Sequence, residues 1–287
     1  MSFVVFADGT ANLPQNLLNG ILLLPCEYTL NGEPRVYDGN VDEFDGHAYY
    51  ELLRNGANIK TSLLNSQLFL SRFTPILEQG KDIIYVAMSS GISGTCQAAR
   101  SAAKELMERF KDRFVYIVDS YGCGFGSGML AIQAAKWSHE KMDARSAAKR
   151  LDEEVPHACQ YFTVDDLNFL KRTGRISGST AKIGTLLHIK PILFGDKTGH
   201  ITVCEKVRGR KKAIEVLARR FEEKRLKTAA PRVFISHGDC PEDAEYLAEQ
   251  IKGKAADASV LICQHEPFSG SHVGPGMLGL FFWGVER

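Results

Sequence analysis

Short apolar runs alternate with helical patterns through the first half of the chain. Runs typical of buried strands cover residues 3–7, 21–24, 83–88 and 114–118. Helical patterns cover residues 42–53, 66–79, 97–110, 124–139 and 144–155. This alternation predicts an α/β domain with a mostly parallel sheet, whose ligands bind at the carboxyl ends of the strands.

In the second half of the chain, the strand and helix patterns follow a different order. Strand patterns cover residues 160–164, 189–194, 201–206, 232–237 and 259–264, and helical patterns cover residues 166–171, 179–186, 211–224 and 242–252. The turn-forming residues from Asp196 to Gly199 predict a hairpin between two of these strands. We therefore predict two α/β domains: an N-terminal domain of residues 1–157 and a C-terminal domain of residues 158–270. We expect residues 271–287, with a last strand at 277–282, to rejoin the first sheet.

Composition narrows the class of protein. The 287 residues are 44% hydrophobic and 24% charged, with a net charge of +1, which gives no electrostatic reason to expect nucleic acid or an anionic membrane as a partner. The N-terminus enters a strand pattern with no basic region or cleavage site, so we expect no signal peptide. No apolar stretch approaches the ~18 residues of a membrane helix. The seven cysteines form no C-x-x-C pair. We therefore expect reduced, buried thiols, no metal site, no cofactor and a soluble cytoplasmic protein.

The turn after the strand at residues 83–88 carries most of the chemical information. It contains Ser89, Ser90, Gly91, Ile92, Ser93, Gly94 and Thr95, and a helical pattern follows. Hydroxyls and unpaired N–H groups at the start of a helix attract a carboxylate or a phosphate. The alternative is that Ser93 and Thr95 only cap the helix, since capping uses the same residue types.

Three familiar motifs do not fit. A P-loop requires Lys after its second glycine, and none follows Gly94; a nucleophile elbow requires Gly two residues after its serine, where Ser93 has Thr95. The glycine-rich run from Gly122 to Gly128 lacks the G-x-G-x-x-G spacing of a dinucleotide site. We expect those glycines to permit close backbone packing instead.

A series of motifs in order along the chain resembles the DegV family of bacterial fatty-acid-binding proteins. The motifs are Asp8-Gly-Thr-Ala-Asn-Leu-Pro14, Thr61-Ser62, Ser89 to Thr95, Asp119-Ser120, Leu170 to Ser177, Ile189 to Leu193, Lys206-Val-Arg208 and His272-Val-Gly-Pro-Gly276. The resemblance spans essentially the whole chain. It implies two α/β domains that hold one long-chain fatty acid in the cleft between them, with no catalysis by the protein itself. It also implies a carrier role in which a separate fatty acid kinase converts the bound acid to acyl phosphate for phospholipid synthesis.

The resemblance also implies which residues bind the ligand. The carboxylate site carries over onto Thr61, Ser62, Ser93, Gly94, Thr95 and His272, with Gly274 in a tight turn beside the ligand. Hydroxyls and helix-start N–H groups donate to a carboxylate, and a histidine does so while titrating near neutrality. Arg175 and Arg208, with Lys211 and Lys212, match basic positions near the ligand mouth or the partner surface.

The chain departs from the family pattern at several positions. Leu63, Leu64 and Asn65 stand where the family continues Thr-Ser with Gln-Pro-Ser, and Thr173 replaces a glycine before Gly174-Arg175. Cys96 and Val273 replace common Tyr and Thr residues. These changes predict a reshaped loop after Ser62 and a change in how tightly the head group is bound.

Other functions remain open on the residues alone. One is a serine acyl hydrolase or transferase with Ser93 as nucleophile, His272 as base and Asp119 as orienting group. Another is a nucleotide-binding subunit, which the missing P-loop disfavours. His272 is also compatible with a purely structural role, and Thr61 and Ser62 with helix capping.

Overall fold

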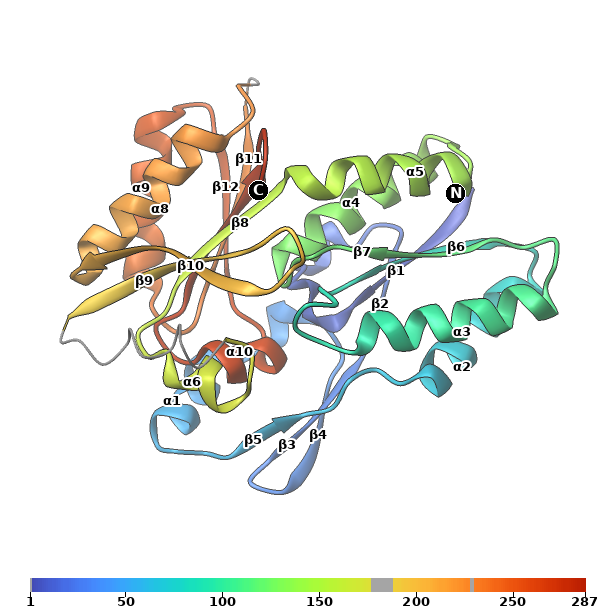
Figure 1. Cartoon of the computed structure of the whole chain (residues 1–287), viewed down its shortest axis with the longest axis horizontal. Helices are drawn as coiled ribbons and strands as arrows, with labels where there is room; N and C mark the ends of the chain where they lie inside the picture. Colours follow the sequence, from blue (N-terminus) through green and yellow to red (C-terminus); the bar gives the residue numbers. More distant parts are fainter. Residues whose placement is uncertain (1, 177–187, 228–229) are drawn as a thin grey trace.

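The computed structural model describes residues 2–176, 188–227 and 230–287. Figure 1 shows a parallel sheet and a mixed sheet side by side, with a smaller antiparallel sheet projecting below them. The expected α/β architecture is confirmed. The helix expected at residues 179–186 lies outside the described residues.

The first sheet is parallel, as predicted, and has four strands in the order β2-β1-β6-β7. Its strands are β1 (Phe3–Asp8), β2 (Ile21–Leu24), β6 (Asp82–Ala87) and β7 (Val115–Asp119). Helices α2 (Ser66–Glu78) and α3 (Thr95–Arg109) cover one face, and α4 (Phe125–His139) and α5 (Ala144–Glu154) cover the other. Alternate residues of β1 enter the two hydrophobic cores, which explains its continuous apolar run.

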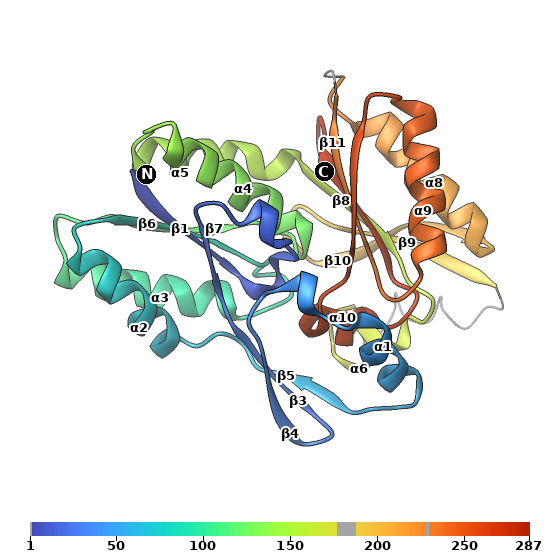
Figure 2. The same cartoon turned by 180° about the vertical axis from the view of Figure 1, so that it is seen from behind.

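The second sheet is mixed, with six strands in the order β10-β9-β8-β13-β11-β12. They are β8 (Ala158–Thr163), β9 (Ile189–Gly195), β10 (Ile201–Arg208), β11 (Arg232–His237), β12 (Ser259–Gln264) and β13 (Leu278–Trp283). Helices α8 (Arg210–Lys224) and α9 (Pro241–Lys254) cover its outer face, seen from behind in Figure 2. The predicted hairpin of β9 and β10 is confirmed.

The last strand corrects one expectation. β13 pairs with β8 and β11 in the middle of the mixed sheet, so the prediction that residues 271–287 rejoin the first sheet is wrong for this strand. Its apolar run indicates burial but carries no information about which strands it pairs with. Phe282 packs against Phe221 of α8, and this contact belongs to the second core. The boundary near residue 158 stays a prediction.

The third sheet was not expected. Strands β3 (Cys26–Leu30), β4 (Glu33–Tyr37) and β5 (Ile59–Thr61) form an antiparallel sheet in the order β4-β3-β5. Short helices complete the described parts of the chain: α1 (Gly46–Arg54), α6 (Asn168–Arg172), α10 (Pro267–Val273) and 3-10 turns at Gly9–Ala11, Gln15–Leu17, Val41–Glu43 and Val155–His157. Because β5 contacts α10, the small sheet connects to the second half of the chain.

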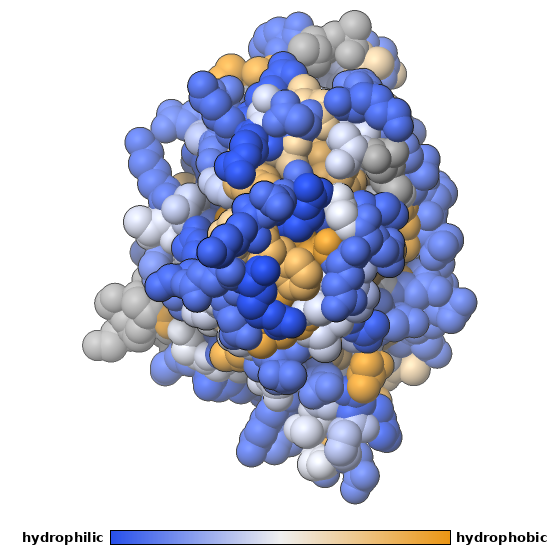
Figure 3. Space-filling model, turned by 90° about the vertical axis from the view of Figure 1, so that its right-hand side faces the viewer, coloured by the Kyte–Doolittle hydropathy of each residue, from blue (hydrophilic) through white to orange (hydrophobic). Residues whose placement is uncertain are grey.

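The two large sheets share one core along their seam. Phe125 of α4 stacks on Phe234 of β11 with ring centroids 4.7 Å apart, and Phe281 of β13 meets the same ring edge to face. Hydrophilic residues cover most of the face shown in Figure 3, with apolar residues visible between them. The seam is therefore a packed interface whose geometry fixes whatever space remains between the sheets.

Candidate functional site

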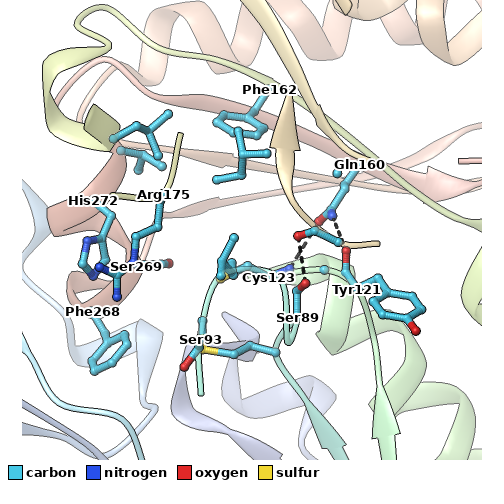
Figure 4. Close-up of a pocket in the computed structure, with 18 of the residues that line it drawn as sticks. Ser89, Ser93, Tyr121, Cys123, Gln160, Phe162, Arg175, Phe268, Ser269 and His272 are labelled. Carbon is cyan, nitrogen blue, oxygen red and sulfur yellow. Dashed lines mark hydrogen bonds between the residues drawn. The ribbon is translucent and has the colours of Figure 1, made fainter. Parts of the chain in front are cut away.

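A cavity of about 400 Å³ lies between the first sheet and the mixed sheet. Its walls come from the loops after β6 and β7, from β8, β13 and the hairpin of β9 and β10, from α6 and α10, and from the end of β5 with the residues after it (Figure 4). The cavity thus lies at the carboxyl ends of two parallel strands, the position that the alternation of strands and helices predicts. Its volume falls within the ~300–1,000 Å³ of small-molecule sites.

The walls are mainly apolar. The apolar lining residues are Leu63, Met88, Ile92, Phe162, Leu170, Ile201, Phe268, Val273, Met277 and Phe281. Leu63 and Gly94 line the cavity and are also exposed, whereas Ser89, Gly195 and Gly199 line it and are buried. We call the end near Leu63 the open end of the cavity, and the end near Ser89, Gly195 and Gly199 its inner end.

The turn after β6 carries its hydroxyls on a rigid frame. Ser93 Oγ donates to Thr95 Oγ1 at 3.0 Å and accepts from Thr95 N at 3.2 Å, so Ser93 binds the first N–H group of α3 from one residue before the N-cap, Gly94. Ser93 and Gly94 line the cavity, while Thr95 is buried behind them and accepts from Leu64 N. Below the turn, buried Asp8 accepts from Met88 N at 2.7 Å, and burial raises the pKa of this carboxyl to about 6. Ser93 thus bonds to the first residue of the helix and also lines the cavity.

His272 and Thr61 meet at the open end. His272 Nε2 lies 2.9 Å from Thr61 Oγ1, and His272 Nδ1 is buried with no partner among the described residues. Burial, and then the charges of Arg175 and Arg172, lower the pKa of His272 to about 4. The ring is therefore neutral at pH 7 and carries one N–H. Thr61 and neutral His272 together carry two polar hydrogens, one O–H and one N–H. One of them forms the bond between the two residues, so in either tautomer of His272 the other hydrogen is left to donate to a ligand.

Arg175 supplies the only cationic side chain along the cavity's described walls. It follows α6, is half-buried, and donates to Thr173 O. Within the described segments no carboxylate pairs with it, and no Asp or Glu lines the cavity. Burial lowers the pKa of this guanidinium, because charge is poorly solvated there. A ligand with a negative head group compensates such a charge.

Only some of the expected site residues line the cavity. Thr61, Ser93, Gly94, His272 and Arg175 all line the cavity. The remaining expected residues are not among its lining residues: Ser62, Thr95, Gly274 and Arg208. Ser62 is exposed, with its N–H on Glu27 O, and Arg208 is exposed at the end of β10.

Gly274 has a structural role in the turn that follows α10. It ends the helix with a φ of 77°, and an added Cβ would lie 2.5 Å from the ring of Phe169. A side chain at this position therefore meets both backbone strain and a clash. The turn sets the direction in which α10, and with it His272, faces the cavity.

The observed contacts do not form the catalytic triad that the hydrolase alternative requires. Ser93 bonds to Thr95, and His272 bonds to Thr61. Asp119 accepts from the N–H groups of Ser90 and Tyr121 and lies 3.8 Å from Arg100. A triad needs the nucleophile on the base and the base on the acid. Neither bond occurs between the described side chains.

The cysteines differ in how deeply they are buried. The described cysteines are free, but Cys204 is exposed and three more are only partly buried, so the expectation of buried thiols holds only in part. Burial raises the pKa of Cys96 to about 12, with Asp119 adding to the effect, which excludes a reactive thiolate there.

Groups able to hold a metal ion are absent from the described residues. Within these residues, too, no helix has the length and apolar character to cross a bilayer.

Sequence reasoning missed the helix that carries much of the site. Helix α10 contributes Phe268, Ser269, His272 and Val273 to the cavity wall. Its start has a readable signal, because Pro267 occupies its first turn and the Glu266 side chain accepts from two N–H groups. Buried Glu266 has a pKa raised to about 7 by desolvation.

Comparisons with known proteins agree on one family. The model of the DegV family, described as a family of uncharacterised proteins, matches residues 2–284. A DegV domain-containing protein of Clostridium perfringens is 36% identical over 286 residues, covering 99% of this chain and 98% of that protein. One from Lactococcus lactis is 31% identical, covering 98% of this chain and 97% of that protein.

Solved structures give the same result. A DegV family protein from Thermus thermophilus, described by its fatty acid binding, has a TM-score of 0.86 at 26% identity, covering 99% of this chain and 100% of the other. DegV from Bacillus subtilis, described as a fatty acid binding protein, has a TM-score of 0.84 at 28% identity, covering 99% of both chains.

Proposed function

Because this chain belongs to the DegV family, we propose that it binds one long-chain fatty acid in the cavity between its sheets. The observation that carries the proposal is the combination of an apolar cavity with a cation that has no acidic partner among the described residues. Relatives from Thermus thermophilus and Bacillus subtilis, both described as binding fatty acids, share the fold over nearly the whole chain.

In this proposal the carboxylate lies at the open end of the cavity. The Thr61–His272 pair offers one unused hydrogen, the Ser93 hydroxyl can rotate toward the ligand, and Arg175 supplies the positive charge. A charged hydrogen bond contributes about 1.5–3 kcal/mol, more than a neutral one. Ser62, Thr95 and Gly274, which the family resemblance also implies, act in this scheme by shaping the loops that hold these donors.

The acyl chain lies along the apolar walls toward the inner end. Each buried CH2 contributes roughly 0.8 kcal/mol, so a long chain binds far more tightly than a short one. Binding of this kind needs neither a nucleophile nor a metal. We therefore propose a carrier rather than an enzyme.

We extend the proposal to a partner. A separate fatty acid kinase would transfer a phosphoryl group from ATP to a carboxylate oxygen of the bound acid, releasing ADP and forming acyl phosphate for phospholipid synthesis. Use of ATP would place this step in the cytoplasm. Exposed Arg208, with exposed Lys211 and Lys212 on α8, offers a basic surface for such a partner. Arg208→Glu should then reduce acyl phosphate formation and leave fatty acid retention unchanged.

The binding proposal is tested with delipidated protein and radiolabelled palmitate. Ser93→Ala should weaken retention by about tenfold, the worth of one hydrogen bond to a charged group. Ser101→Ala is the matched control, because Ser101 is exposed on the same helix and bonds only to its own turn. Unchanged retention in Ser93→Ala would remove Ser93 from the site, and absence of binding by the wild-type protein would overturn the proposed function.

A further inference from the structure

We propose that Gln160 closes the inner end of the cavity and sets the longest acyl chain that the protein retains. This inference rests on the proposed fatty acid binding and adds the residue that determines chain length. Gln160 belongs to β8, where it pairs with Phe281 of β13. It shares a face of this strand with Phe162, two residues on, and both line the cavity.

Gln160 lies at the end of the cavity away from the head-group residues. In Figure 4, His272 and Arg175 lie on one side, and Gln160 lies on the other with Tyr121 and Ser89. An acyl chain that starts between Ser93 and His272 and follows the apolar walls therefore runs toward Gln160.

The amide of Gln160 spans the seam between the two sheets. Its Nε2 donates to Tyr121 O at 3.0 Å, and its Oε1 accepts from Cys123 N at 3.3 Å. Both partners belong to the loop after β7, in the first half of the chain. The side chain is thus held at both ends of its amide and cannot swing aside without unpairing a partly buried N–H group.

Three glycines fit closely around this amide. An added Cβ at Gly126 would lie 2.4 Å from Gln160 Oε1, and one at Gly122 would lie 3.1 Å from the same atom. An added Cβ at Gly195 would lie 2.7 Å from Gln160 Nε2. Of the glycine-rich run after β7, which fits no dinucleotide site, Gly122 and Gly126 pack against this amide, whereas Gly128 packs against Ala11 and Leu13.

Neighbouring contacts close the rest of the inner end. Ser89 Oγ donates to Gly199 O at 2.8 Å, and Arg287 donates to Ser120 O at 3.2 Å. These bonds join the loops after β6 and β7 to the hairpin and the final residues. Hydrocarbon gains nothing by displacing polar groups that are already paired. Truncation of Gln160 is therefore the change that lengthens the space open to a methyl end.

The test compares the acyl chains that each variant selects. Delipidated protein is incubated with an equimolar series of saturated fatty acids with even-numbered chains, from lauric to behenic acid, and the bound acids are counted by native mass spectrometry. In Gln160→Ala, the most abundant bound acid should be about two carbons longer than in the wild-type protein. The bound amount of this longer acid, relative to the acid that the wild-type protein prefers, should rise by about tenfold. Gln160→Ser gives a second truncation, with a hydroxyl close to the backbone.

Two control variants distinguish the loss of side-chain volume at Gln160 from the loss of its hydrogen bonds and from the loss of an amide elsewhere. Gln160→Leu keeps most of the volume but loses both hydrogen bonds, so it should keep the wild-type chain length. Gln264→Ala removes a similar amide, which accepts from Gly46 N at 2.7 Å outside the cavity, and should also leave the profile unchanged. Wild-type profiles in both truncated variants would overturn the role of Gln160 while leaving fatty acid binding intact. Absence of bound acid in the wild-type protein would overturn the proposed function itself.

Discussion

His272 Nε2 lies 2.9 Å from Thr61 Oγ1 although 211 positions separate the two residues in the chain. The contact joins α10, close to the end of the chain, to the end of β5 in the small sheet. It exists only when the first half of the chain and the final residues have packed together. The head-group end of the cavity is therefore a product of the whole fold.

Removing the Thr61 hydroxyl should weaken fatty acid binding. Thr61→Val preserves the shape of the side chain but removes a hydroxyl that lines the cavity and deprives His272 Nε2 of its hydrogen-bond partner. The ring is then no longer held at the head-group end, so we expect about a tenfold rise in Kd by isothermal titration calorimetry. Thr29→Val is the control, since Thr29 lies in the same small sheet and does not line the cavity. Equal losses in the two variants would indicate a general effect on the small sheet rather than a head-group contact.

Removing the charge of Arg175 should discriminate between head groups. Arg175→Gln is expected to raise the Kd for a fatty acid by about tenfold or more and to change binding of the corresponding fatty alcohol much less. Arg172→Gln serves as the control, because Arg172 is exposed and stacks 4.1 Å from the centre of the Phe169 ring without lining the cavity. The same loss for acid and alcohol would exclude a direct charge interaction.

Glu266 should make stability depend on pH. Desolvation raises the folded-state pKa of this carboxyl from 4.5 to about 7, so the folded protein binds more protons than the unfolded chain between these values. The contribution of Glu266 is thus largest below about pH 4.5 and is lost as the pH rises through 7. Relative to Glu266→Gln, the wild-type free energy of unfolding should fall by up to about 3 kcal/mol from pH 4.5 to pH 8.

Urea unfolding at several pH values measures this difference directly. Subtracting the two curves cancels the titration of His265 and His272, whose pKa values burial lowers to about 3 and about 4 and which act in the opposite direction. A constant difference across the range would show that Glu266 does not titrate there.

The seam between the sheets should be intolerant of a single methyl group. An added Cβ at Gly91 would lie 2.5 Å from Gly199 C, so Gly91→Ala forces the loop after β6 away from the hairpin. We expect a loss of about 2 kcal/mol in the free energy of unfolding. Gly253→Ala, in α9 with open space around it, should instead stabilise by up to about 1 kcal/mol. Similar stability of both variants in urea unfolding would contradict close packing at the seam.

Local patterns predicted the parallel sheet well because both of its faces are buried. The run at residues 83–88 and the helix after it correspond closely to β6 and α3. The membership of β13 was not predictable in the same way, since burial looks alike in either sheet while pairing depends on residues far away in the chain. The small sheet did have a local signal: Asn31-Gly32, with φ values of 53° and 92°, forms the turn between β3 and β4.

The site was predictable only in part. Ser93 stands out because a hydroxyl-rich turn follows a buried strand, but the residues alone do not pair Thr61 with His272. The family resemblance supplied both positions. Gln160 carried no signal, because one polar residue within a strand is usually exposed, and its role depends on glycines in another part of the chain.

Native mass spectrometry of the purified protein, followed by lipid analysis of the same sample after denaturation, is the decisive test of fatty acid binding. We expect one bound fatty acid per chain, whose mass disappears on denaturation and is recovered as a free long-chain acid. A chain that is ligand-free as purified, and that remains so after long-chain fatty acids are added back, would contradict this expectation.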